Sequence, residues 1–225
     1  NNFSEIEVAG PGFLNIKLSK FALLNNIKTI LNNNEVYGSF KSSETYNIEF
    51  VSANPTGPMH VGHCRGAIYG DVLANLLKFN GNKVVKEYYI NDYGNQIRSF
   101  VESIHFRIME IKYKKEFPKK ENLYPGLYIK DIANKIIQEN VSLDLSDFEK
   151  NFEFLKKESI EISMELIKKD LKLLGISHDN FSSETDIVNK DLVNKAVNKL
   201  KEKKFVEEGF LQPPKGETNE NWKKI

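Results

Sequence analysis

The segment from Ser52 to His63, which reads Ser-Ala-Asn-Pro-Thr-Gly-Pro-Met-His-Val-Gly-His, constrains the fold of this chain more than any other segment. Apolar side chains alternate just before it and predict a strand from Tyr46 to Val51. Two prolines and a glycine exclude a helix between Ser52 and Met59. After Gly62 a helical spacing of apolar residues begins, at Ala67, Ile68, Val72, Leu73, Leu76 and Leu77. We therefore expect this segment to link a strand to a helix that ends near Gly81.

A second strand, predicted from Lys83 to Ile90, follows that helix. Asn91 and Asp92 are then expected to cap a further helix. Strand, helix and strand in succession form a βαβ unit, whose two strands are parallel. In open sheets of this kind, ligands bind at the carboxyl ends of the strands, where the next helix presents its N-terminus. The loop from Ser52 to His63 is expected to lie there.

Four segments are expected along the chain. Residues 1–38 combine two short extended pieces with one helix and predict the end of a small α+β N-terminal domain. Residues 39–110 hold the βαβ unit and predict the first half of a Rossmann-like parallel sheet in an α/β fold. Residues 111–204 are expected to form a mainly helical insertion. Residues 205–225 are expected to return toward the sheet.

The predicted insertion opens with a lysine-rich loop and continues as helices. Within it, Ser146 is expected to cap a long helix that Gly175 ends. The loop itself has two readings, a solvated loop or a surface for nucleic acid, and we favour the first. Its lysines are Lys112, Lys114, Lys115, Lys119 and Lys120.

Composition bounds the class of protein. The 32 Lys and Arg residues nearly balance the 31 Asp and Glu residues, so net charge argues neither for nor against a nucleic-acid partner. Cys64 is the only cysteine, which excludes an internal disulfide and a cysteine-held metal cluster and fits a reducing cytoplasm. No apolar stretch approaches the roughly 18 residues of a membrane span. The chain starts without methionine and ends abruptly at Ile225, so we expect a fragment of a longer cytoplasmic protein.

His60 and His63 are two of only four histidines in the chain, and both fall at the expected start of the helix. Each imidazole can donate a ring N–H to a phosphate oxygen and so support the charge that builds during substitution at phosphorus. Gly62 has no Cβ, which allows an adenine or a ribose to approach the backbone closely. Prolines stiffen the loop before it. The alternative reading is a Pro-Gly turn with two surface histidines.

Two runs of residues resemble the family of bacterial arginyl-tRNA synthetases. The first run, from Glu49 to Ala67, contains the loop, and the second, from Glu87 to Ile97, reads Glu-Tyr-Tyr-Ile-Asn-Asp-Tyr-Gly-Asn-Gln-Ile. His60 to His63 resembles the first signature of class I synthetases, and the residues before it resemble the version that distinguishes the arginine enzymes. The resemblance covers the whole chain. Ala9 to Leu18 resembles the end of the family's N-terminal tRNA-contacting domain, and Leu174 to Asp179 resembles its connective insertion.

This resemblance implies a site for ATP and L-arginine. For ATP it implies two phosphate-binding, catalytic histidines and the residues between them, which here are His60, Val61, Gly62 and His63. For the arginine pocket it implies His63 again, together with the run around the ammonium group, which here is Ser52, Ala53 and Asn54. A hydroxyl and an amide oxygen can accept bonds from an ammonium group, whereas alanine offers only its backbone.

Glu49 is a candidate for the same pocket on chemical grounds. Strands in a covered parallel sheet are normally apolar on both faces, so a carboxylate three residues before Ser52 requires a partner. An arginine substrate supplies one, as a guanidinium or an ammonium group. The alternative is a carboxylate at a solvated strand end or one that pairs with a protein lysine. A site that binds the charge of arginine rejects neutral analogues strongly, so no editing domain is expected.

Other residues are weaker candidates. Phe13 and Asn15 align with family positions that contact the D-loop of the tRNA, and a core Phe13 beside an exposed Asn15 is an equal alternative. Asn91, Asp92 and Gln96 match a family motif, although a helix cap is the simpler explanation of Asp92. Structural or surface roles are expected for Cys64, His105 and His178, and for Arg65 a surface position, with contact to a phosphate as its alternative.

As a whole, the resemblance implies an arginine–tRNA ligase that uses ATP with Mg²⁺ as a substrate and acts on L-arginine and tRNA(Arg). It implies a cytoplasmic monomer with no membrane partner, no protein-held metal and no tightly bound cofactor. The 225 residues contain no second signature loop of the Lys-Met-Ser-Lys-Ser type, so by themselves they are not expected to complete adenylation. Two alternatives stay open: another adenylyl- or nucleotidyl-transferring enzyme that shares His-x-Gly-His, and a non-catalytic tRNA-binding remnant.

Overall fold

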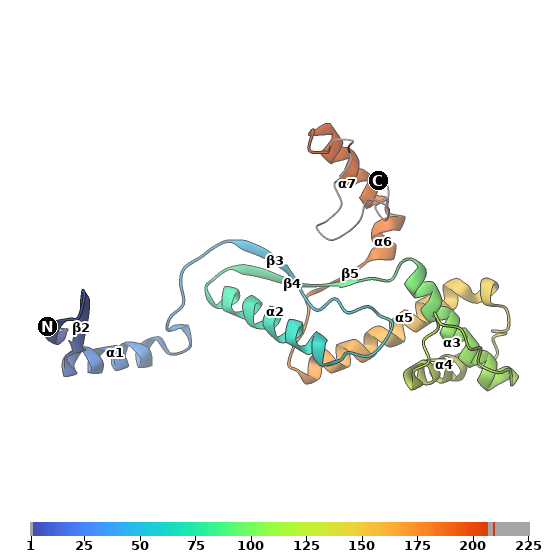
Figure 1. Ribbon diagram of the computed structural model, residues 1–225, viewed down its shortest axis with the longest axis horizontal. Helices are drawn as coiled ribbons and strands as arrows, with labels where there is room; N and C mark the ends of the chain where they lie inside the picture. The colour runs from blue at the N-terminus through green and yellow to red at the C-terminus, as the bar shows by residue number, and fades with distance from the viewer. Residues whose placement is uncertain (1, 207–208, 210–225) are drawn as a thin grey trace.

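The computed structural model describes residues 2–206 and residue 209 (Figure 1). Most of the predicted return segment, residues 205–225, therefore lies outside the described residues. Among the described helices, none is both long and apolar enough to cross a bilayer. The elements in chain order are β1 (Phe3–Ala9), β2 (Phe13–Leu18), α1 (Lys20–Asn33), a 3₁₀ turn (Asn34–Val36), β3 (Thr45–Glu49), α2 (Val61–Phe79), β4 (Lys83–Ile90), α3 (Asn95–Tyr113), α4 (Leu127–Glu139), α5 (Phe148–Leu173), β5 (Asn180–Ser183), α6 (Glu184–Asn189) and α7 (Leu192–Glu202).

β3, β4 and β5 form one parallel sheet with β4 in the middle. β3 and β4 confirm the two predicted strands, and α2 links them as the βαβ pattern predicts. β5 was not predicted, because its sequence, Asn-Phe-Ser-Ser, is short and contains a single apolar residue. It lies inside the range 111–204, so this range contributes a strand to the sheet as well as helices.

One face of the sheet is covered and the other is open in the part of the chain that the structure describes. Along β4, Val84, Lys86 and Tyr88 are buried, whereas Val85 between them is 41% exposed. Figure 1 shows α2 and α5 on the same side of the sheet, where they share a core of Phe50, Ala67, Tyr88, Met164, Ile167, Leu171 and Ile176. The expectation of a sheet covered on both faces is wrong for these residues, because the opposite face leaves side chains such as Glu49 exposed.

The covered face holds a buried ion pair. Lys86 Nζ lies 2.6 Å from Asp71 Oδ1 and 2.9 Å from Asn75 Oδ1, and both partners belong to α2. A buried ammonium group is unfavourable without such partners. The pair therefore allows a lysine to occupy the covered face of β4, and it also links that strand to α2.

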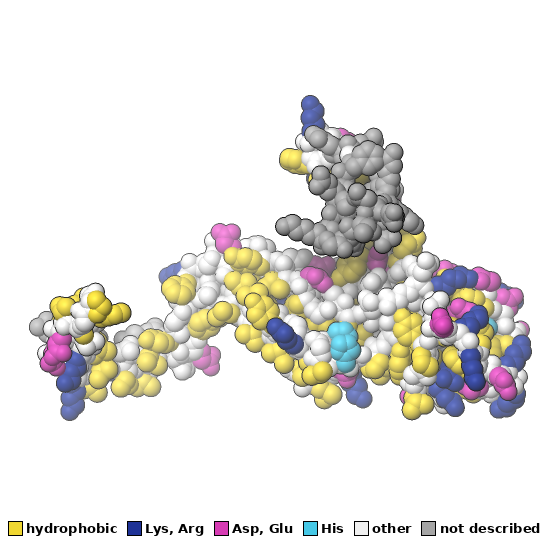
Figure 2. All heavy atoms as spheres, in the orientation of Figure 1, with side chains coloured by type: hydrophobic (Ala, Val, Ile, Leu, Met, Phe, Trp, Pro, Cys, Tyr) yellow, Lys and Arg dark blue, Asp and Glu magenta, His cyan; other side chains and the backbone are white. Residues whose placement is uncertain are grey.

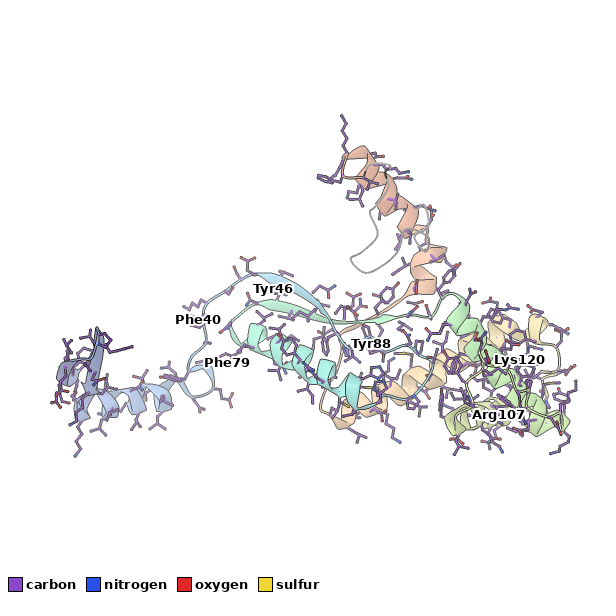
Figure 3. All side chains as sticks on the ribbon, in the orientation of Figure 1. Phe40, Tyr46, Phe79, Tyr88, Arg107 and Lys120 are labelled. Atoms are coloured by element: carbon purple, nitrogen blue, oxygen red, sulfur yellow. The ribbon has the colours of Figure 1, made fainter. Side chains whose placement is uncertain are left out.

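α3, α4 and α5 pack around a second apolar core, which includes Phe100, Ile104, Ile132 and Leu155. The lysine-rich loop folds back on this helical unit. Lys120 Nζ pairs with Glu102 of α3 at 3.1 Å (Figure 3), whereas Lys112, predicted in the loop, lies in the last turn of α3 and donates to the Leu143 carbonyl at 2.7 Å. These local contacts favour the solvated-loop reading, because the two ammonium groups already have protein partners.

β1 and β2 form an antiparallel hairpin that α1 follows, as the sequence predicts. Figure 1 shows this unit set apart from the sheet, and none of residues 2–38 is buried. Phe13 is 70% exposed, so it lies in no core formed by the described residues. Asn15, two residues further along β2, is exposed as well.

Two predicted helix caps differ from the structure. α5 is capped by Asp147, one residue after the predicted Ser146, and the Asp147 carboxylate accepts the Lys150 N–H at 3.0 Å. α3 begins after Gly94, which provides no side-chain cap, so Asp92 does not cap this helix.

Asp92 instead joins the ends of β4 and β5. Its carboxylate accepts hydrogen bonds from Ser183 Oγ at 2.6 Å and from the Thr185 N–H at 2.8 Å, in the first turn of α6. Ile90 and Ser183 are neighbours in the sheet register, so the side chain reaches across the two strands. The predicted cap was assigned to the wrong helix because β5 had not been recognised.

Gly70 allows α2 to lie close to the sheet, and this contact generates a prediction. An added Cβ at Gly70 would lie 2.2 Å from Phe50 Cγ, whereas one at Gly66, in the same helix, would meet no atom within 4 Å. We expect Gly70→Ala to lower the free energy of unfolding by about 1–3 kcal/mol through overpacking. Gly66→Ala is the matched control and should raise it by up to about 1 kcal/mol. Urea denaturation measures both, and an equal gain in the two variants would contradict the close approach.

Candidate functional site

The imidazole rings of His60 and His63 stack at the first turn of α2, with centroids 3.8 Å apart and an interplanar angle of 23°. His60 Nδ1 accepts a hydrogen bond from the Gly62 N–H at 3.1 Å. His63 Nδ1 accepts one from the His60 N–H at 3.3 Å. The two histidines therefore cap the helix reciprocally, a role that Ser, Thr, Asp or Asn fills in most helices.

These bonds determine which ring nitrogen carries the proton. A neutral imidazole has one N–H, and a nitrogen that accepts a hydrogen bond is the unprotonated one. In their neutral form both rings therefore carry the proton on Nε2, and neither Nε2–H has a partner among the described residues, so both can donate to a ligand. Figure 2 shows histidine side chains at the surface at this end of α2.

The electrostatic surroundings keep one of these rings neutral. Burial, and then the neighbouring His60, lower the pKa of His63 below its ordinary value of 6.5. The unfolded chain therefore binds a proton at this residue more readily than the folded chain does. The folded state therefore loses stability relative to the unfolded chain as the pH falls from about 6.5 through the lower folded pKa, and this residue has no such effect at higher pH.

The His60 ring lies where a side chain at residue 62 would begin. An added Cβ at Gly62 would lie 2.9 Å from His60 Cε1 and 3.0 Å from His60 Nδ1. Any side chain there must push the imidazole away from the helix terminus. The glycine of His-x-Gly-His therefore maintains the capping contact, in addition to leaving the backbone open to a ligand.

The chain leaves β3 through a strained turn. Val51 has φ of 68° and Ser52 has φ of 39°, a region that β-branched residues adopt very rarely. Each such residue raises the free energy of the fold by about 1–3 kcal/mol, and it persists only where neighbouring contacts hold it. Groups from neighbouring elements hold the residues after Val51.

β4 holds the start of the loop. Ser52 Oγ accepts the Tyr89 N–H at 3.0 Å, and the Tyr88 hydroxyl donates to the Ala53 carbonyl at 2.7 Å. Figure 3 shows Tyr88 on the side of β4 that faces α5, and its side chain is fully buried. Burial raises the pKa of Tyr88, so the hydroxyl stays protonated and continues to donate.

α4 holds the middle of the loop. The Tyr128 hydroxyl donates to the Thr56 carbonyl at 2.9 Å, and its ring lies against Gly57, where an added Cβ would be 3.3 Å from the hydroxyl oxygen. Burial raises the pKa of Tyr128 as well. The helical part of the chain therefore contributes directly to the geometry of the loop.

Asn54 bonds through both ends of its carboxamide. Asn91 Nδ2 donates to Asn54 Oδ1 at 3.1 Å, and Asn54 Nδ2 donates to Gln96 Oε1 at 3.0 Å. Asn91 follows β4 and Gln96 lies in the first turn of α3. The structure thus brings together Asn54 and two residues of the motif that sequence reasoning had left without a role.

Glu49 ends β3 on the open face of the sheet. Its register partner is Glu87 of β4, so two carboxylates stand side by side. The Glu87 carboxylate accepts bonds from Ser182 and Asn47, and these bonds lower its pKa. Among the described residues, the Glu49 carboxylate has no hydrogen bond or ion pair. The described residues thus place Glu49 as a solvated carboxylate at a strand end, which is the alternative reading of this residue.

Sequence reasoning missed the two tyrosines that hold the loop. Tyr88 lies in the run that resembles the synthetase family, but the sequence does not show that its hydroxyl bonds to the Ala53 carbonyl. Tyr128 is 72 residues from Thr56 and carries no sequence signal. His178 and His105 have structural roles, as expected: their Nε2 atoms lie 3.3 Å from the Phe50 carbonyl and 3.1 Å from the Leu145 carbonyl.

Other predicted residues lie away from this cluster. Phe13 and Asn15 belong to the hairpin unit, which Figure 1 shows apart from the loop. Asn15 lines a shallow hollow of about 280 Å³ with Glu5 and Glu7. A larger cavity of about 470 Å³ lies along α5 at the ends of β4 and β5, and Asp92 is the one candidate residue in its lining.

Known proteins are similar to this chain in sequence and in fold. Residues 26–210 match the family described as tRNA synthetases class I (R), catalytic domain. The chain is 52% identical over 220 residues to an arginine–tRNA ligase of Pelagibacter ubique, and 46% identical over 223 residues to one of Ehrlichia ruminantium. These alignments cover 96% and 98% of this chain but only 38% of each relative. The chain therefore spans about 38% of the length of the curated relatives it matches.

Solved structures agree with the fold. A Campylobacter jejuni protein provisionally assigned as an arginyl-tRNA synthetase superposes with a TM-score of 0.74 at 35% identity, over 85% of this chain and 42% of that one. The arginyl-tRNA synthetase of Thermus thermophilus superposes with a TM-score of 0.56 at 22% identity, over 89% of this chain and 33% of that one. The second likeness supports the fold alone. Together they confirm the predicted α/β class.

The strained turn generates a prediction that separates backbone strain from side-chain packing. Val51→Gly and Val51→Ala both remove the valine side chain, but only glycine adopts a positive φ without strain. We expect Val51→Gly to be more stable than Val51→Ala by about 1 kcal/mol, whereas glycine is normally less stable than alanine by about 0.5–1 kcal/mol. Urea unfolding of the two variants measures the difference. The ordinary order, with alanine more stable, would show that Val51 is not held in this conformation.

Proposed function

The chain belongs to the catalytic-domain family of class I arginyl-tRNA synthetases, and from this premise we propose that it is part of an arginine–tRNA ligase. In this proposal the protein activates L-arginine with ATP to form arginyl-adenylate and pyrophosphate. It then transfers the arginyl group to the 3′ end of tRNA(Arg). The full activity, with its substrates and partners, is proposed for the whole protein to which this chain belongs.

The observation that carries the proposal is the pair of Nε2–H donors at the N-terminus of α2. His60 and His63 accept backbone bonds through Nδ1, which leaves Nε2–H of each ring for phosphate oxygens. Together with Val61 and Gly62, they line the first turn of a helix, whose dipole also favours an anion. We propose that these four residues bind ATP and that both histidines act in catalysis. An imidazole pair that is already oriented in the free protein supports this role.

The arginine site is proposed at the loop beside this pair. Glu49 offers an exposed carboxylate whose register neighbour Glu87 already has bonds of its own. A guanidinium or ammonium group would pair with Glu49 and relieve the repulsion between the two carboxylates. Ser52 and Asn54 each retain an acceptor lone pair, because an oxygen that accepts one bond can accept a second. We propose that they and the Ala53 backbone bind the ammonium end, with His63 at the edge of the pocket.

The chemistry that this arrangement supports is displacement at phosphorus. The arginine carboxylate attacks the α-phosphorus of ATP, a new C(O)–O–P bond forms, and the bond to the β-phosphate oxygen breaks as pyrophosphate leaves. No proton transfer to a side chain is needed in this step. His60 and His63 would donate to the phosphate oxygens whose negative charge rises in the transition state. The loop would hold the two substrates in line, and that positioning is its main contribution.

Mg²⁺ is assigned to the nucleotide. Among residues 2–206 and 209, no group of three or more His, Cys, Asp or Glu side chains is placed to hold a metal ion. Mg²⁺ is commonly bound through substrate phosphates with only one or two protein ligands. We therefore propose that it enters with ATP, and no catalytic step is assigned to a metal held by this chain.

The remaining assignments are proposals that follow from the family. We propose that residues 1–38 end a tRNA-contacting domain in which Phe13 and Asn15 meet the tRNA, where an exposed aromatic ring can stack on a base. We propose that residues 39–110 form the first half of the catalytic sheet, that residues 111–204 form the connective insertion, and that residues 205–225 return to the sheet. A monomeric, cytoplasmic protein completes the proposal.

ATP–pyrophosphate exchange by the encoded protein, assayed one amino acid at a time with tRNA present, tests the function. We expect exchange with L-arginine and with no neutral amino acid. Gly62→Ala should reduce the exchange rate about 10²-fold, because the added Cβ displaces the His60 ring. Gly66→Ala, in the same helix and without a contact for its Cβ, should leave the rate unchanged.

Other outcomes identify the alternatives. Exchange with a different amino acid, or adenylyl transfer to another acceptor, would assign the site to a different enzyme that shares His-x-Gly-His. Binding of tRNA without any exchange would indicate a non-catalytic remnant. Equal rates for the Gly62 and Gly66 variants would contradict the role of the oriented histidine pair even if arginine is the substrate.

A further inference from the structure

We propose that Asn91 and Gln96 are positioning residues that set the direction of the Asn54 carboxamide, and so determine whether the substrate ammonium group meets its oxygen or its nitrogen. This inference rests on the proposed function, in which Asn54 binds the ammonium end of L-arginine. It assigns a role to two residues that do not themselves have to touch the substrate. The proposal stands on a chain of three carboxamides that the fold brings together from three different elements.

The geometry of this amide chain is simple. Asn91 Nδ2 donates to Asn54 Oδ1 at 3.1 Å, and Asn54 Nδ2 donates to Gln96 Oε1 at 3.0 Å. Asn54 and Asn91 are half-buried, and Gln96 is exposed. Among the described residues, the side chains of Asn91 and Gln96 form no other hydrogen bond. The three amides therefore orient one another.

A chain of carboxamides has two self-consistent directions. Each amide offers a carbonyl oxygen at one end and an NH₂ group at the other, so reversing one member requires reversing all three. In the structure, the Asn54 oxygen is on the Asn91 side and its NH₂ group is on the Gln96 side. An ammonium group only donates, so it can bind the Asn54 oxygen but not its NH₂ group. The inference places the ammonium group on the Asn91 side, where this oxygen lies, so reversing the chain would present the NH₂ group of Asn54 to arginine instead.

Two isosteric substitutions lock this chain in opposite directions. Gln96→Glu places an acceptor-only carboxylate opposite Asn54 Nδ2 and so enforces the direction that the structure has. Asn91→Asp places an acceptor-only carboxylate opposite Asn54 Oδ1 and so forces the amide of Asn54 to turn over. Each change replaces one NH₂ group by oxygen and adds one negative charge, so each variant is the matched control of the other.

The experiment measures KM for L-arginine and for ATP by pyrophosphate exchange in the protein as its gene encodes it. We expect Asn91→Asp to raise KM for arginine at least about tenfold, the effect of losing a hydrogen bond to a charged group. Gln96→Glu should leave this KM unchanged or lower it. KM for ATP should stay the same in both variants, because the histidine pair is not altered. Cooperative thermal unfolding confirms that each variant is folded.

Several results would overturn the inference. If charge near the cationic substrate were the only effect, both variants would lower KM for arginine. If the amides were merely structural, both would change KM for arginine and for ATP together, or neither would. Gln96→Leu, at an exposed position, provides a further variant should Asn91→Asp fail to fold: loss of the acceptor frees the Asn54 amide and should raise KM for arginine alone. An unchanged KM for arginine in that variant would also overturn the inference.

The test separates this inference from the proposed function. Absence of arginine-dependent exchange in the unaltered protein would refute the proposed function itself. Suppose instead that the unaltered protein catalyses exchange and that the two variants have the same KM for arginine. That result would refute the inference and leave the proposed function standing.

Discussion

The first turn of α2 holds two imidazole rings by their Nδ1 atoms, and the proposed chemistry depends on this arrangement. The Gly62 N–H bonds one ring and the His60 N–H bonds the other. Helix capping uses Nδ1 and leaves Nε2–H for a ligand, so one pair of side chains serves structure and binding through different atoms. The glycine between them is needed because a Cβ there would displace His60. The spacing of His-x-Gly-His follows from these contacts.

The loop before the histidines is held in advance of any ligand. It leaves β3 through two residues with positive φ, and such strain persists only where neighbours hold it. Tyr88 and Tyr89 of β4 and Tyr128 of α4 supply hydrogen bonds at successive positions of the loop. Two parts of the chain that are far apart in sequence therefore hold a single short segment. A loop held in this way loses little freedom when a substrate binds.

Local patterns predicted much of this fold, and long-range contacts account for what they missed. The alternation in Tyr46, Ile48 and Phe50 and the helical spacing after Gly62 were sufficient to predict the βαβ unit, although α2 buries only Ala67, Gly70 and Ala74 among the described residues. β5 carries no such pattern, since its Ser and Asn side chains bond to neighbouring strands and to each other. The role of Asp92 was misread for the same reason, as its partners lie on that unrecognised strand and on α6.

The site shows the same division. The sequence identified the histidines, the Ser52 to Asn54 run and Glu49, because each carries distinctive chemistry at a recognisable place. It could not show that Glu49 stands beside Glu87, since that contact depends on strand register. It also could not show that Asn91 and Gln96 meet Asn54. The sheet is open on one face in the described residues, so burial does not require a partner for Glu49, and its pairing with a cationic substrate stays a proposal.

Nitrogen NMR of the histidine rings in the ligand-free protein tests the central claim most directly. Two-bond ¹⁵N–¹H spectra at about pH 8 should show both His60 and His63 with the proton on Nε2, because each Nδ1 accepts a hydrogen bond from a backbone N–H. On acidification, His63 should titrate below its ordinary pKa of 6.5. Protons on Nδ1, or an even mixture of the two tautomers, would contradict the claim that the helix terminus orients the rings before substrate binds.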